Sequence, residues 1–106
     1  MKLQMHSIHF DADRKLIDFI QRKADKLDTF YGRIIDGEVT LRLRKDETQE
    51  NKLVELKVRI PGQQLFVSEY ARTFEEATDL AVDAMRRQLK RKKEKEQDHT
   101  IINQLK

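Results

Sequence analysis

The chain has 106 residues, of which 38% are hydrophobic, and its formal net charge is +3. A chain of this length supports one domain around one modest core. It contains no cysteine, which excludes a disulfide framework and a cysteine nucleophile. No segment approaches the roughly 20 apolar residues that span a bilayer, and the polar N-terminus does not resemble a signal peptide. We therefore expect one cytoplasmic domain with no membrane contact.

The positive charge is concentrated at the C-terminal end. Residues 84–106 hold more basic than acidic side chains, whereas residues 1–83 are slightly acidic. Residues 86–95 alone contain seven Lys or Arg side chains and a single acid, Glu94. Such a density is typical of a segment that binds a polyanion, or of a solvated helix end.

A strand and then a helix are predicted in the N-terminal part. Over residues 2–9, Leu3 and Met5 share one face, which is the pattern of a half-buried strand. Asp13 is suited to cap the helix that follows, and this helix is expected to end near Gly32. Its apolar face consists of residues three or four positions apart: Leu16, Ile17, Ile20, Ala24, Leu27 and Tyr31.

Three more strands are predicted in the middle of the chain. Residues 38–44 and 54–60 alternate between apolar and polar side chains, and the polar KDETQENK segment between them is expected to be an exposed loop. Pro61 and Gly62 suit a tight turn into a further strand, LFVSEYAR. Phe66 and Tyr70 share one face of that strand. Their rings could stack on nucleic-acid bases or pack in the core, and we predict that they pack in the core.

A second helix is predicted from Thr73 onward. Thr73 and Glu76 have the spacing of a capping box, in which side chains and amides at the helix start bond reciprocally. The apolar stripe then comprises Phe74, Ala77, Leu80, Ala81, Ala84, Met85 and Leu89. Helix-forming residues continue to about Glu96, so the last two turns are expected to project beyond the core as a basic rod.

The predicted order is therefore β-α-β-β-β-α, an α+β fold in which one four-stranded sheet carries both helices on a single face. The strands that flank the first helix are expected to run parallel. Residues 1–96 are predicted to form the domain, and residues 97–106 a flexible C-terminal tail.

No arrangement for catalysis or metal binding is evident. His6 and His9 are three positions apart near a strand end, which directs them to different faces, and no third ligand accompanies them. The glycines form no phosphate-binding loop, and the serines lie in no nucleophile motif. We therefore predict no enzymatic activity, no metal, no cofactor and no small-molecule substrate.

The basic end of the second helix is the feature that points to a function. Arg86, Lys90 and Lys93 fall on one stripe of this helix, and Arg87 and Arg91 fall on an adjacent one. Two parallel rows of cations on a rigid helix suit the phosphates of RNA or DNA. A second basic surface is predicted on the open face of the sheet from Arg42, Arg44, Lys57 and Arg59.

Three segments of the chain resemble the ribosome hibernation promoting factors and the related ribosome-associated inhibitor proteins, also described as sigma-54 modulation proteins. They are KADKLDTFYGRI at residues 23–34, VRIPGQQLFV at residues 58–67 and DLAVDAMRRQLKRKKEK at residues 79–95. The last is the most characteristic of the family. The resemblance runs from residue 1 to about residue 96.

This resemblance implies a β-α-β-β-β-α fold that binds the small ribosomal subunit between head and body, over the mRNA and tRNA sites. It implies inhibition of translation in stationary phase or stress, by a short form that lacks the C-terminal dimerisation domain of long members. Whether ribosomes are paired or silenced singly stays open. The candidate contacts to ribosomal RNA are Arg22, Lys23, Lys26, Arg86, Arg87, Lys90, Arg91 and Lys93.

Two other readings stay open from the residues alone. An α-β-β-β-α order is embedded in the chain, and it is the order of general double-stranded RNA-binding modules. The chain is alternatively a small regulator that binds a protein, with the basic rod as a solvated helix end. In each case we expect a monomer in solution, because one short domain shows no second hydrophobic face.

Overall fold

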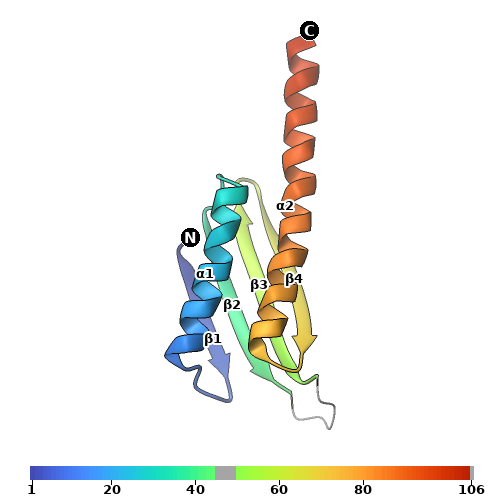
Figure 1. The fold of residues 1–106 in the computed structure, drawn as a ribbon. Helices are drawn as coiled ribbons and strands as arrows, with labels where there is room; N and C mark the ends of the chain where they lie inside the picture. Colours follow the sequence, from blue (N-terminus) through green and yellow to red (C-terminus); the bar gives the residue numbers. More distant parts are fainter. Residues whose placement is uncertain (45–49, 106) are drawn as a thin grey trace.

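The computed structural model describes residues 1–44 and 50–105, with side chains described as far as residue 96. The elements are β1 (Leu3–Ile8), α1 (Arg14–Phe30), β2 (Asp36–Leu43), β3 (Lys52–Ile60), β4 (Gln63–Ala71) and α2 (Phe74–Leu105). Figure 1 shows one sheet with α1 and α2 side by side across one of its faces. The predicted α+β fold and its order of elements are therefore confirmed.

The strands lie in the order β1-β2-β3-β4. β1 pairs with β2 in parallel, as predicted for strands that flank a helix, and the other neighbours are antiparallel. The turn between β3 and β4 is the predicted one at Pro61 and Gly62. Gly62 has a φ of 85°, which glycine adopts without a steric cost, and the turn brings Ile60 opposite Gln63.

One hydrophobic core lies between the sheet and the helices. The strands contribute alternate residues such as Leu41, Leu56 and Val58, and α1 contributes Ile20 and Leu27. α2 contributes one stripe at intervals of four: Ala77, Ala81, Met85 and Leu89. Among the described side chains, Leu89 is the last of α2 to be buried.

Both helices begin at their predicted capping residues, although of the two reciprocal bonds of the predicted capping box the described residues form only the one that Thr73 accepts. The Asp13 carboxylate accepts a hydrogen bond from the Leu16 amide at 2.8 Å, and the Thr73 hydroxyl accepts one from the Glu76 amide at 3.0 Å. Such caps satisfy amides that have no partner within the helix. α1 ends at Phe30, two residues before the predicted Gly32.

The core position predicted for Leu80 was wrong. Leu80 is 42% exposed, because it lies about 100° around the helix from Ala81 and therefore off the buried stripe. Thr78 is buried instead. Its hydroxyl donates to the Phe74 carbonyl oxygen at 2.7 Å, so a polar side chain enters the core with its hydrogen bond made.

The core role predicted for Phe66 and Tyr70 was also wrong. Their side chains are 50% and 40% exposed. Residues of a strand alternate between the two faces, and Val67 and Ala71 point to the helices, so Phe66 and Tyr70 point to the face that the helices leave uncovered. The loop predicted from KDETQENK falls largely on residues 45–49, which lie outside the described residues.

α2 is longer than expected. Its backbone continues past Glu96 to Leu105, and a helix of 32 residues is about 48 Å long. Figure 1 shows its C-terminal half extending well beyond the sheet, and the molecule measures 58 × 25 × 18 Å. The flexibility predicted for residues 97–106 stays a prediction. In the part of the chain that the structure describes, no helix combines the length and apolarity needed to span a membrane.

Candidate nucleic-acid interface

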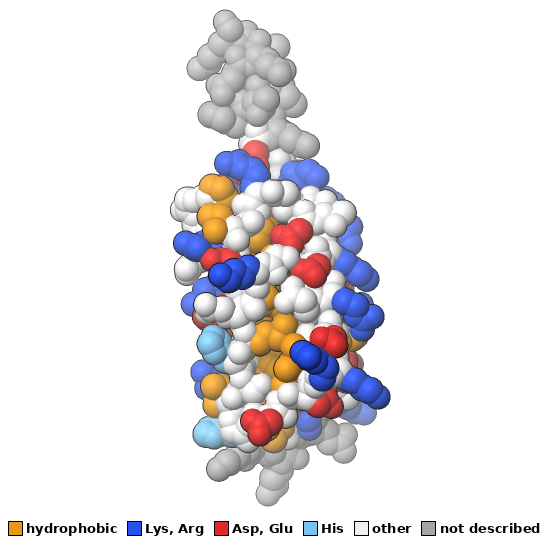
Figure 2. Space-filling model, turned by 90° about the vertical axis from the view of Figure 1, so that its left-hand side faces the viewer, with side chains coloured by type: hydrophobic (Ala, Val, Ile, Leu, Met, Phe, Trp, Pro, Cys, Tyr) orange, Lys and Arg blue, Asp and Glu red, His pale blue; other side chains and the backbone are white. Residues whose placement is uncertain are grey.

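The two helices bring basic side chains together along a groove between them. Lys23 and Lys26 of α1 and Arg86 of α2 line this groove, whose volume is about 440 Å³. Its floor is partly apolar, with Leu27, Phe30 and Val82, and two carboxylates, Asp79 and Asp83, also border it. Seen from the β1 edge in Figure 2, Lys and Arg side chains crowd the helix-covered side, on the right, with acidic side chains among them. Three of the predicted contact residues therefore share one surface, although α1 and α2 are far apart in the chain.

Phe30 orders two of the cations of α2. The Arg86 guanidinium lies 4.9 Å from the centroid of the Phe30 ring, and the Lys93 ammonium lies 5.1 Å from it. The Lys93 ammonium also donates to the Phe30 carbonyl oxygen at 3.3 Å. Cations over an aromatic ring are attracted to its electron-rich face. Arg86 and Lys93 are thus held beside the groove rather than ranging freely through solvent.

The last turns before residue 97 extend beyond the core, as predicted, but they also contact the end of α1. Glu96 accepts a hydrogen bond from the Tyr31 hydroxyl at 2.7 Å and forms an ion pair with Arg33 at 3.2 Å. Burial and the bond to Glu96 both raise the pKa of Tyr31 above its ordinary value. The end of α1 therefore clamps α2 beyond the core, and the two helices present their cations as one rigid unit.

A second group of cations lies on the outward side of α2. Arg87, Lys90 and Arg91 are exposed, and within residues 1–44 and 50–96 none of them has an ion-pair partner. Lys26 is likewise exposed and unpaired in that part of the chain. Cations that are already exposed and unpaired bind phosphate without first giving up an ion pair.

Two predicted contact residues are differently placed. Lys23 forms an ion pair with Asp79 at 3.1 Å across the groove and so links the two helices. It can bind a phosphate only by giving up this ion pair. Arg22 lies outside the groove, in a shallow depression that also contains Lys15 of α1 and Glu75 from the first turn of α2, and its guanidinium is 6.0 Å from the Phe19 ring centroid. The predicted residues therefore divide into two groups: Lys23, Lys26 and Arg86 line the groove, whereas Arg87, Lys90 and Arg91 lie on the outward side of α2.

Sequence reasoning missed Phe30 as a member of this surface. Its position carried a usable signal, because Lys23, Lys26 and Phe30 follow one another at intervals of three and four and must share a helix face. That Arg86 and Lys93 meet the same ring depends on how α1 and α2 pack. No pattern in one sequence reports that packing.

The described residues hold no cluster of three or more His, Asp or Glu side chains that could bind a metal ion. His6 lies 3.5 Å from Glu38 on the open face of the sheet, at Nε2 and Oε2.

The fold resembles those of two solved structures. The Thermus thermophilus Protein Y N-terminal domain matches with a TM-score of 0.75 and 24% identity, over 86% of this chain and 98% of that one. A ribosomal subunit interface protein from Coxiella burnetii matches with a TM-score of 0.76 and 18% identity, over 88% and 98% of the two chains. At these identities the likeness establishes the fold.

The family is established from the sequence itself. No curated protein sequence matches the chain. The model of one family, described as sigma 54 modulation protein / S30EA ribosomal protein, matches residues 3–97 and so covers nearly the whole chain. The chain therefore belongs to the sigma 54 modulation protein / S30EA ribosomal protein family, whose members are ribosome-associated.

Proposed function

We propose that the chain binds the small ribosomal subunit through its helical face and holds the ribosome inactive. The helical face comprises Lys26, Phe30, Arg86, Arg87, Lys90, Arg91 and Lys93. The observation that carries the proposal is the convergence of cations from α1 and α2 on one rigid surface, with Lys26 and the outward row of α2 unpaired in the described part of the chain. Family membership supports the ribosome as the partner.

The physical basis of binding is neutralisation of RNA phosphates. Each cation that meets a phosphate releases condensed counterions, which favours binding at low salt and weakens it at high salt. The clamp between Glu96 and Tyr31 fixes α2 against α1, so little freedom is lost when the cations meet the RNA. The contacts are mainly to phosphates, so position on the ribosome depends on the shape of ribosomal RNA rather than on its sequence.

The proposed consequence is exclusion of mRNA and tRNA. A protein seated between the head and body of the small subunit occupies the space that both ligands need, so it inhibits translation without any chemical step. Such an activity fits storage of ribosomes in the cytoplasm during stationary phase or stress. We expect the protein to act as a monomer, which sedimentation equilibrium at micromolar concentration tests directly.

The first experiment is sedimentation of purified protein with separated ribosomal subunits. We expect co-migration with the small subunit, and displacement of the protein by mRNA together with tRNA. Added protein should inhibit translation in a reconstituted system. Equal retention on any RNA duplex would instead support a general double-stranded RNA-binding module, and absence from every ribosomal fraction would contradict the proposal.

A further inference from the structure

The face of the sheet opposite the helices carries two exposed aromatic side chains, Phe66 and Tyr70. We propose that this open sheet face binds single-stranded RNA, with bases stacked on Phe66 and Tyr70. The side chains of this face form cross-strand rows, which follow from the register of the strands. In one row Phe66 lies opposite Lys57 on β3, and Lys57 lies opposite Glu38 on β2. In another row Tyr70 lies opposite Leu53 on β3, and Leu53 lies opposite Arg42 on β2.

The two aromatic rings are the first argument. Exposed aromatic side chains on a sheet offer flat surfaces on which bases of any sequence stack. Phe66 and Tyr70 are four residues apart on β4, and therefore about 14 Å apart along the strand. Ser68, a small side chain, lies between them on the same face. The spacing leaves room for two separate bases along one extended strand.

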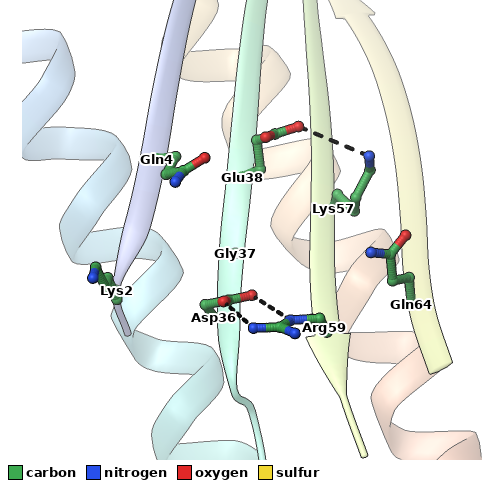
Figure 3. Close-up of a pocket in the computed structure, with 8 residues that line it drawn as sticks. All are labelled: Lys2, Gln4, Asp36, Gly37, Glu38, Lys57, Arg59 and Gln64. Carbon is green, nitrogen blue, oxygen red and sulfur yellow. Dashed lines mark hydrogen bonds and ion pairs between the residues drawn. The ribbon is translucent and has the colours of Figure 1, made fainter. Parts of the chain in front are cut away.

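The second argument is a hollow on the same face, lined in part by Lys57, the cross-strand neighbour of Phe66. It has a volume of about 230 Å³ and contains neutral amides, from Gln4 and Gln64, as well as charged groups. Figure 3 shows Gln4 and Gln64 on opposite sides of the hollow, with Lys57 and Arg59 between them. Amides donate and accept hydrogen bonds, as the edges of unpaired bases require. The hollow thus provides hydrogen-bonding groups next to a stacking surface.

The charge of the face is the third argument. Its carboxylates are neutralised within the sheet: Asp36 by Arg59 at 2.6 Å, Glu55 by Arg42 at 2.8 Å, and Glu38 by Lys57 at 3.8 Å. Lys2 adds positive charge at the rim of the hollow. The face is therefore mildly positive, which favours a phosphate backbone over an acidic or neutral peptide.

A duplex does not fit this face. Stacking on Phe66 and Tyr70 needs bases that are unpaired and turned outward, whereas a duplex offers only its backbone and grooves. The open sheet face and the helical face also differ in their dependence on salt. Binding that relies on stacking persists at salt concentrations that weaken binding that relies on phosphate contacts alone.

A tryptophan reporter tests the proposal. The chain contains no tryptophan, so Phe66→Trp introduces a single indole, which can be excited apart from the tyrosines, and keeps an aromatic ring at the site. A uridine oligonucleotide of about ten nucleotides, within the range that such surfaces bind, is then added. We expect the fluorescence to be quenched as bases stack on the indole. Adding Tyr70→Ala to the reporter should weaken binding about tenfold, and Tyr70→Phe should leave it nearly unchanged.

A second variant separates this site from the helical face. In the Phe66→Trp background, the changes Arg87→Glu, Lys90→Glu and Arg91→Glu remove the outward cations of α2. We expect quenching to persist in this variant even if ribosome binding is lost. Failure of the helical proposal would therefore leave this one intact. Absence of quenching in the reporter, or an affinity that Tyr70→Ala leaves unchanged, would overturn the proposal.

Discussion

The helical face and the open sheet face both carry cations and aromatic rings, but they differ in whether the cations form ion pairs. On the helical face the outward cations of α2 have no ion-pair partner in the described part of the chain, and Phe30 lies between Arg86 and Lys93. On the open sheet face the cations of β2 and β3 pair with carboxylates on neighbouring strands, and the aromatic rings stand exposed. The composition of a surface thus does not determine how strongly it attracts a polyanion; the local pairing of its charges does.

The largest difference between the faces should appear in their contribution to stability. Leu89 is buried beneath the helical face, whereas Phe66 is half exposed on the open one. We expect Leu89→Ala to lower the free energy of unfolding by about 2–5 kcal/mol, because it leaves a cavity in the core. Phe66→Ala should change it by only about 0.5 kcal/mol, as is usual for surface sites. Urea denaturation of both variants measures the difference, and equal losses would contradict the burial described above.

The clamp between Tyr31 and Glu96 should make the helical face sensitive to alkaline pH. Burial and Glu96 raise the pKa of Tyr31 in the folded protein, so this group favours the folded state below the ordinary tyrosine pKa of about 10. The protonated Tyr31 hydroxyl therefore contributes to the stability of the folded protein, and this contribution is lost as the pH rises through the raised pKa. Tyr31→Phe should cost about 0.5–1.5 kcal/mol at neutral pH, through the lost hydrogen bond, and should flatten the alkaline decline. Parallel pH titrations of thermal unfolding would show it.

The open sheet face should respond, more weakly, at acid pH. The Arg59 guanidinium lowers the pKa of Asp36, so the pair favours the folded state above the ordinary aspartate pKa of about 4. This contribution is lost as the pH falls through the lowered pKa. We expect Asp36→Asn to be slightly less stable than the wild type at pH 7 and equal to it in strong acid. Because both side chains are exposed, the effect should be the smallest of those predicted here. A difference that persists in acid would point to a role other than charge pairing.

Much of this architecture could be predicted from the sequence, because each element has a local signal. The Asp13 and Thr73 caps, the Pro61–Gly62 turn and the alternation of β3 depend on neighbouring residues alone, and all are as predicted. Leu80, Phe66 and Tyr70 were misplaced because an apolar side chain does not report which face of its element is covered. The structure adds a constraint that periodicity omits: both helices share one face, so the other stays open.

In the candidate site, too, the features set by neighbouring residues could be predicted, whereas contacts between distant residues could not. The row of Arg87 and Arg91 follows from helical spacing, and the structure leaves both side chains exposed. Lys90, predicted to share a row with Arg86 and Lys93, is exposed as well. The sharing of Phe30 by Arg86 and Lys93, and the clamp at Glu96, join residues that are 56 to 65 positions apart. Such contacts depend on how the two helices pack, so they could not be found in one sequence.

The central claim is that the unpaired cations of the helical face bind ribosomal RNA, and salt dependence tests it most directly. The affinity for purified small subunits is measured from low to moderate salt for the wild type and for a variant with Arg87→Glu and Arg91→Glu. A matched control carries Arg14→Glu and Lys15→Glu, an equal charge change in the exposed first turn of α1, at the opposite end of that helix from Lys26 and Phe30. We predict that the first variant remains folded, binds far more weakly and loses about 1 from the salt slope per contact, while the control binds like the wild type. A folded first variant with the affinity and salt slope of the wild type, or an equal loss in the control, would contradict the account.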